Sequence, residues 1–92
     1  MMTPEQCRMA RAGLSIGVRE LAEAARVSIG TVSRFEAGQG VPDMTVGLFQ
    51  KALERAGAEF VAEGADAGVW LRRSRNNDGS IPLEQLSAEN DE

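Results

Sequence analysis

Apolar residues recur every three or four positions along four stretches of the first 57 residues. This period predicts four short amphipathic helices, because it gathers the apolar positions onto one face of each helix. The helices are expected between a cap at Thr3 and a stop at Gly13, and over Val18–Ala25, Ile29–Ala37 and Met44–Ala56. Their core-facing positions are Cys7, Ala10, Leu14, Val18, Leu21, Ala22, Ala25, Val32, Phe35, Leu48, Phe49, Ala52, Leu53 and Ala56.

Polar caps and glycines are expected to set the ends of these helices. Thr3 and Gln6 have the spacing of a capping box at the first helix. Ser28 and Asp43 are the expected caps of the third and fourth helices. The glycines expected to end helices are Gly13, Gly38 and Gly57.

After the fourth helix the pattern changes from helical to extended. Residues 59–62 and 69–72 are two short apolar runs separated by a segment that contains glycine, which predicts a small antiparallel hairpin. The fold class is therefore mainly α, with four to five helices, a short C-terminal β-hairpin and a disordered acidic tail. The expected divisions are a helical domain at 1–57, a β-like extension and possible dimerisation element at 58–73, and a flexible tail at 74–92.

The acidity of the chain lies in this tail. The formal net charge is −4, but residues 76–92 hold five Asp and Glu and no Lys or Arg, whereas the first 75 residues carry ten Lys and Arg against nine Asp and Glu. The near-neutral body neither requires nor excludes a polyanionic partner, since binding depends on where the charges lie. The tail is expected to be a solubiliser, a protein-binding segment or a competitor for a nucleic-acid surface.

Several function classes lack the residues they need. There is no run of about 18 apolar residues and no signal peptide, so we expect a cytoplasmic protein without membrane association. The sequence has no His or Tyr, no phosphate-binding Gly-Lys-Ser/Thr loop and no Cys/His set, so we expect no catalytic site, metal or cofactor. Glu20 and Glu23 are expected to be solvated rather than an acid–base pair. Cys7 is expected to be a buried thiol rather than a redox or dimer-linking residue.

The segment from Val18 to Gly38 carries the functional signal. Two short helices joined by the three residues Arg26–Ser28 must cross steeply, which pushes the second helix outward with its amino end exposed. An exposed helix of this width fits the major groove of DNA. The segment resembles the helix-turn-helix of the lambda-repressor/Cro-like family, also called the xenobiotic-response-element family, over about Thr3–Gly57. The residues that match its motif are Leu21, Ala22, Val27, Ser28, Thr31, Val32, Ser33, Arg34, Glu36 and Gly38.

This resemblance implies which residues contact DNA. The groove-facing positions are matched by Ser28, Ile29, Gly30, Thr31, Ser33 and Arg34, and Arg19 is placed to meet a backbone phosphate. Arg34 would pair bidentately with guanine, the hydroxyls would bond phosphates or base edges, and Ile29 would touch a thymine methyl. Glu36 matches a position that is more often structural. The alternative for Arg19 and Arg34 is that both are ordinary solvated side chains.

The sequence departs from the family mainly in its charge. The loop Ala37–Asp43 has no basic residue, Gly30 offers no side chain for base reading, and Arg26 replaces a common turn glycine. The basic residues on the expected face are Arg19 and Arg34, with Arg8 and Arg11 as further candidates. So few charges predict weak electrostatic attraction for each monomer, and hence a need for dimerisation.

We therefore expect a homodimeric transcription regulator whose third helix reads double-stranded DNA at an inverted repeat, with half-sites about 34 Å apart. The alternative is a helix-turn-helix protein that acts mainly by binding another protein, such as a transcription activator. That class includes antiactivators, antitoxins and mobile-element regulators, and the acidic tail, Ile29, Gly30 and the uncharged loop favour it. Trp70 is expected either in the core of the hairpin or as an anchor of the dimer.

Overall fold

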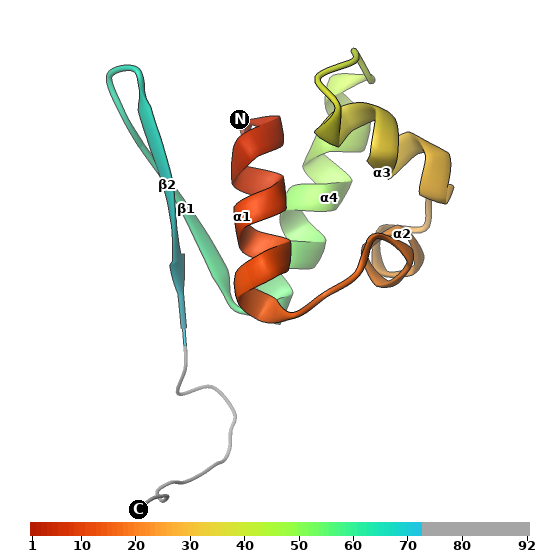
Figure 1. Ribbon diagram of the computed structural model, residues 1–92, viewed down its shortest axis with the longest axis horizontal. Helices are drawn as coiled ribbons and strands as arrows, with labels where there is room; N and C mark the ends of the chain where they lie inside the picture. The colour runs from red at the N-terminus through yellow and green to blue at the C-terminus, as the bar shows by residue number, and fades with distance from the viewer. Residues whose placement is uncertain (73–92) are drawn as a thin grey trace, which may run out of the picture.

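The computed structural model describes residues 1–72 as four helices followed by a two-stranded antiparallel sheet (Figure 1). The elements are α1 Pro4–Leu14, α2 Val18–Ala25, α3 Ile29–Glu36, α4 Asp43–Ala56, β1 Ala58–Glu63 and β2 Asp66–Leu71. The predictions of a mainly helical chain and of a C-terminal hairpin are confirmed for this part of the chain. The predicted acidic tail lies outside the described residues.

Local side-chain bonds set the amino ends of two helices as predicted. The Thr3 hydroxyl accepts the N–H of Gln6 at 3.1 Å, and the Gln6 side-chain oxygen accepts the N–H of Thr3 at 2.9 Å, which completes the capping box. Ser28 caps α3 through a hydroxyl that accepts the N–H of Thr31 at 3.1 Å. At the other end of the helical part, Gly57 ends α4 with a positive φ of 122°.

Two of the predicted boundaries and two of the predicted burials are wrong. Gly13 lies inside α1, which ends at Leu14. The next residue, Ser15, takes the left-handed conformation. Asp43 is the first residue of α4 rather than its cap, because the extended backbone of Pro42 occupies the cap position without a side-chain bond. Leu48 and Ala56 are exposed rather than part of the buried face of α4. A smaller difference is that α3 ends at Glu36, one residue before the predicted Ala37.

The core lies where α4 packs against α1 and α2. Phe49 of α4 is fully buried, and its ring centroid lies 5.6 Å from that of Phe35 on α3, in a tilted arrangement. Small aliphatic side chains and the Cys7 thiol fill the rest, so Cys7 is the buried free thiol that was predicted. Among the described helices, none is both long and apolar enough to span a bilayer.

The hairpin is held against α1 by the side chain of Gln6. This side chain is only 3% exposed, and its amide nitrogen donates to the carbonyls of Val61 on β1 and Gly68 on β2, at 2.8 and 3.0 Å. One residue therefore caps α1 and holds both strands. Leu71 packs closely on Gly13: a Cβ there would lie 2.5 Å from the end of the leucine side chain, which would have to move aside.

We expect Gln6→Ala to lower the free energy of unfolding by about 2–3 kcal/mol, because it removes a cap and the buried donor of two carbonyls. Gln6→Glu separates the two roles, since it keeps the capping oxygen but brings a carboxylate against those carbonyls. It should be at least as destabilising at pH 7 and regain part of the loss at pH 4, where a protonated carboxyl donates. Urea unfolding of both variants, each compared with wild type at the same pH, measures this; wild-type stability of Gln6→Glu at pH 7 would contradict it.

Candidate nucleic-acid interface

The connection between α2 and α3 turns the chain sharply. Arg26 takes the left-handed conformation with φ 62°, which is the position where the family resemblance predicts glycine. The N–H of Val27 bonds the carbonyl of Ala22 at 3.0 Å, and the half-buried Val27 side chain packs against the core. Ser28 then begins α3. The connection is therefore three residues long, and α3 lies at the side of the molecule away from the hairpin (Figure 1).

One face of α3 is buried and the opposite face meets solvent. Val32, Phe35 and Glu36 are buried, and their positions on the helix leave the other side outward. Five of the positions that the resemblance assigned to DNA contact are exposed, namely Ser28, Ile29, Gly30, Ser33 and Arg34, while Thr31 is half-buried. The structure therefore brings these six positions together on one side of the molecule.

A chain of hydrogen bonds runs along this outward face. The Ser28 hydroxyl lies 2.8 Å from the hydroxyl of Thr31, and the Arg34 guanidinium donates to that same Thr31 hydroxyl at 3.3 Å. A Cβ placed on Gly30 would lie 3.6 Å from Nη1 of Arg34. The guanidinium thus lies back along the helix, over the backbone that Gly30 leaves uncovered. Sequence reasoning placed Gly30 at a groove-facing position with no side chain for base reading, and in the structure it is the surface on which Arg34 rests.

The basic groups at this surface have no acidic partner within residues 1–72. The two ion pairs of this part of the chain join Arg11 to Glu36 and Arg72 to Glu59. Arg34 and Arg19, which lies exposed in the first turn of α2, are in neither pair. Arg19 also takes no part in the hydrogen bonds along α3 described above. Both guanidiniums are therefore available to an anion from outside the described chain.

A buried carboxylate joins the end of α3 to α1. Glu36 is 8% exposed, and Arg11 binds it through Nε and Nη2, each 2.7 Å from a carboxylate oxygen. The Cys7 thiol donates to the same carboxylate at 3.1 Å, and Arg8 donates to the main-chain carbonyl of Glu36. Arg11 therefore neutralises an internal charge, although the sequence offered it as a further candidate for contact with DNA. Its spacing of four residues from the core-facing Cys7 was the available signal.

Glu36 is ionised at neutral pH despite its burial. Desolvation opposes the charge, but the hydrogen bonds from Arg11 and Cys7 and the positive charge of Arg11 lower the pKa of Glu36 below its ordinary value on balance. Burial and the adjacent carboxylate raise the pKa of Cys7 well above the ordinary thiol range, so Cys7 remains a protonated donor. The role predicted for Glu36, structural rather than DNA-contacting, agrees with this geometry.

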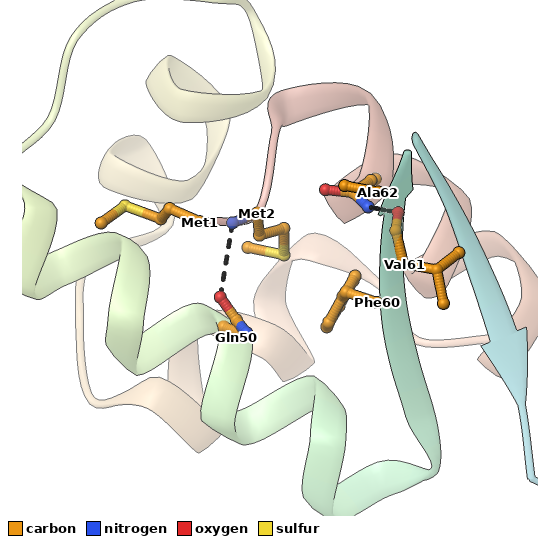
Figure 2. Close-up of a pocket in the computed structure, with 7 residues that line it drawn as sticks. Met1, Met2, Gln50, Phe60, Val61 and Ala62 are labelled. Carbon is orange, nitrogen blue, oxygen red and sulfur yellow. Dashed lines mark hydrogen bonds between the residues drawn. The ribbon is translucent and has the colours of Figure 1, made fainter. Parts of the chain in front are cut away.

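A small hollow lies between the start of the chain, α4 and β1 (Figure 2). The main-chain N–H of Met2 donates to the side-chain oxygen of Gln50 across it, at 3.4 Å. The other residues that line the hollow are Met1, Gln6, Phe60, Val61 and Ala62. No charged side chain lines this hollow, and no group of three metal-ligating side chains is found among residues 1–72. The outward face of α3 is thus the better candidate for function.

In comparisons with known proteins, the chain matches no family model, and no curated protein is significantly similar to it. The resemblance to the lambda-repressor-like family therefore depends on the motif residues of α2 and α3 alone.

We expect Glu36→Gln to lower the free energy of unfolding by about 1–3 kcal/mol at pH 7, because it weakens charge-assisted bonds to buried partners. The folded-state pKa of Glu36 is lowered, so its stabilising effect is present above the ordinary value of 4.5 and is lost as the pH falls through the folded-state value. The difference between wild type and Glu36→Gln should therefore shrink in acid. Urea unfolding at several pH values measures it, with Glu23→Gln on the exposed side of α2 as the control; a difference that does not change with pH would argue against the pairing.

Proposed function

We propose that this protein is a DNA-binding transcription regulator of the helix-turn-helix kind, which inserts α3 into the major groove of double-stranded DNA as a homodimer. The observation that carries the proposal is Arg34, held on the outward face of α3 by Thr31 and without an acidic partner in residues 1–72. A guanidinium in this setting is free to bind the acceptor pair of a guanine.

The shape of α2 and α3 supports the same proposal. Two helices of eight residues each are joined by a three-residue turn, and the second presents polar side chains outward. With its side chains an α-helix is about 10–12 Å across, which matches the roughly 12 Å width of the major groove. The exposed hydroxyls of Ser28 and Ser33 are short donors and acceptors suited to phosphates or base edges. In this arrangement Ile29 faces thymine methyl groups, and Arg19 meets a phosphate near the amino end of α2.

The small number of free basic residues sets the expected mode of binding. Arg11 is neutralised by Glu36, so Arg19 and Arg34 supply most of the attraction at this surface. Each neutralised phosphate contributes to affinity through counterion release, and one protomer therefore binds weakly. Two protomers on an inverted repeat, with half-sites about 34 Å apart, double the number of contacts.

A second candidate function is binding of another protein, such as a transcription activator. The observation that favours it is an apolar side chain on the same surface: Ile29 is 41% exposed. A protein partner accepts a neutral surface of this kind, whereas DNA requires a positive one. The two candidates differ in their response to salt and to removal of the arginines.

We expect the purified protein to enrich a partly palindromic site from a library of random DNA duplexes. On the enriched duplex, Arg34→Ala should weaken binding by about 1–3 kcal/mol per half-site and relax the base preference at one position. Arg19→Ala should weaken all sequences alike and reduce the slope of log affinity against log salt by about 1 per protomer. Fluorescence anisotropy at several salt concentrations measures both effects.

Arg55→Ala is the matched control, because Arg55 is exposed near the end of α4 that leads into the hairpin and should leave the affinity unchanged. If neither Arg19→Ala nor Arg34→Ala alters DNA binding at any salt concentration, the proposed mechanism is wrong. Failure of the library selection, together with capture of a specific protein that is lost in an Ile29→Glu variant, would favour the second candidate.

A further inference from the structure

The hairpin has an outer face that points away from the helices. Directly opposite residues of antiparallel strands share a face, and Ala58, Phe60 and Val69 lie on the face that packs against the core. The outer face therefore consists of three cross-strand pairs: Glu59 with Trp70, Val61 with Gly68, and Glu63 with Asp66. Arg72 extends this face beyond the end of β2, where its guanidinium bonds the Glu59 carboxylate at 2.9 Å.

An apolar knob and a hollow lie next to each other on this outer face. Trp70 is 65% exposed, which excludes the expected alternative that it packs in the core of the hairpin. The neighbouring pair, Val61 and Gly68, has a side chain on one strand only. A shallow hollow beside it is lined by this pair, by Trp70 and by residues 62, 63, 66 and 67 on either side of the turn. A solvent-exposed tryptophan beside a hollow is the kind of feature that anchors a protein interface.

The charges of the outer face are arranged from one end to the other. Its tip carries the carboxylates of Glu63 and Asp66, which form the last pair before the turn. Its base carries the Arg72 guanidinium, and the ion pair with Glu59 leaves both side chains more than half exposed. The face is therefore acidic at the tip, apolar in the middle and basic at the base.

We propose that this outer face binds the outer face of a second copy of the chain, with the two hairpins antiparallel about a twofold axis. The axis runs across the strands, between the cross-strand pair of Glu59 with Trp70 and the cross-strand pair of Val61 with Gly68. Each Trp70 therefore lies over the hollow at the partner's Gly68. The same rotation brings each Arg72 over the partner's Glu63 and Asp66. Both the knob and the charges are then self-complementary, as a twofold interface requires. Parallel hairpins would instead bring the two acidic tips together.

The size of the face predicts a weak dimer. Two strands of six residues offer a surface about 20 Å long, which is small beside the roughly 1,200–2,000 Å² that stable interfaces bury. A dissociation constant in the micromolar range is therefore expected for the free protein. The hairpin stands on the side of α1 opposite α3, so pairing of hairpins leaves both α3 surfaces free (Figure 1). Use of this dimer on an operator rests on the proposed function, whereas self-association is measured without DNA.

Sedimentation velocity of the full chain from about 1 μM to about 1 mM tests self-association over the range of a micromolar dimer. The wild-type protein should pass from monomer to dimer, and Trp70→Ala should weaken the dimer at least about tenfold. Met44→Ala is the control, because it shortens an even more exposed apolar side chain on α4 and should have no effect. Trp70 is the single tryptophan, so its emission should shift to the blue and become less accessible to acrylamide as the dimer forms.

A charge exchange tests the antiparallel arrangement itself. Arg72→Glu alone should not dimerise, and neither should the double variant Glu63→Arg/Asp66→Arg, because each places like charges opposite one another. A mixture of the two proteins should form a heterodimer, in which every charged contact between the protomers is again between opposite signs. Circular dichroism verifies that each variant is folded.

Three results would overturn the proposal: a wild-type chain that is monomeric at every concentration, equal weakening by Trp70→Ala and Met44→Ala, or no recovery in the mixture. The first of these would assign the outer face to a different protein, and the third would assign dimerisation to another geometry. DNA binding that persists in a folded, monomeric Trp70→Ala protein would retain the proposed function while removing this dimer from it.

Discussion

The structure depends most on one buried carboxylate. Glu36 is the last residue of α3, and a charge buried there costs several kcal/mol unless it is paired and hydrogen-bonded. The planar fork of Arg11 and the thiol of Cys7, both on α1, meet that requirement together. A helix of eight residues is not stable alone, so its orientation comes from what it packs against. The exposed face of α3 is therefore set by the position of Glu36 against α1 together with that of Val32 and Phe35 against the core.

Most features that depend on neighbours in the sequence were predictable, and features that depend on distant residues were not. The caps at Thr3 and Ser28 are bonds across three residues, and they were predicted correctly. Gly13 was mistaken for a helix stop because its real partner, Leu71, is a residue of the hairpin. The prediction for Asp43 failed for a different reason: a proline ahead of it already supplied the extended backbone that begins the helix.

The candidate site shows the same division. Helical spacing was sufficient to predict which residues of α3 face outward, because Val32 and Phe35 had to face the core. It was not sufficient to predict that Arg34 would lie over Gly30 and bond Thr31, since that depends on a side-chain conformation. Charge counting likewise placed Arg11 on the surface, although the nearly buried Glu36, 25 residues later, binds it. Arg11 is thus removed from the further candidates that the sequence offered beside Arg19 and Arg34.

Helix α1 connects the two surfaces to which we assign partners. Gln6 and Cys7 are consecutive, and successive side chains of a helix point about 100° apart, so Gln6 bonds the hairpin while Cys7 bonds the end of α3. Each surface is fixed to α1 by a buried polar contact and not by a linker. In a dimer joined through the hairpins, the distance between the two α3 helices would follow from the geometry of α1. If the protein bound equally well to operators whose half-sites were moved apart by inserted base pairs, the connection between the two α3 helices could not be this rigid.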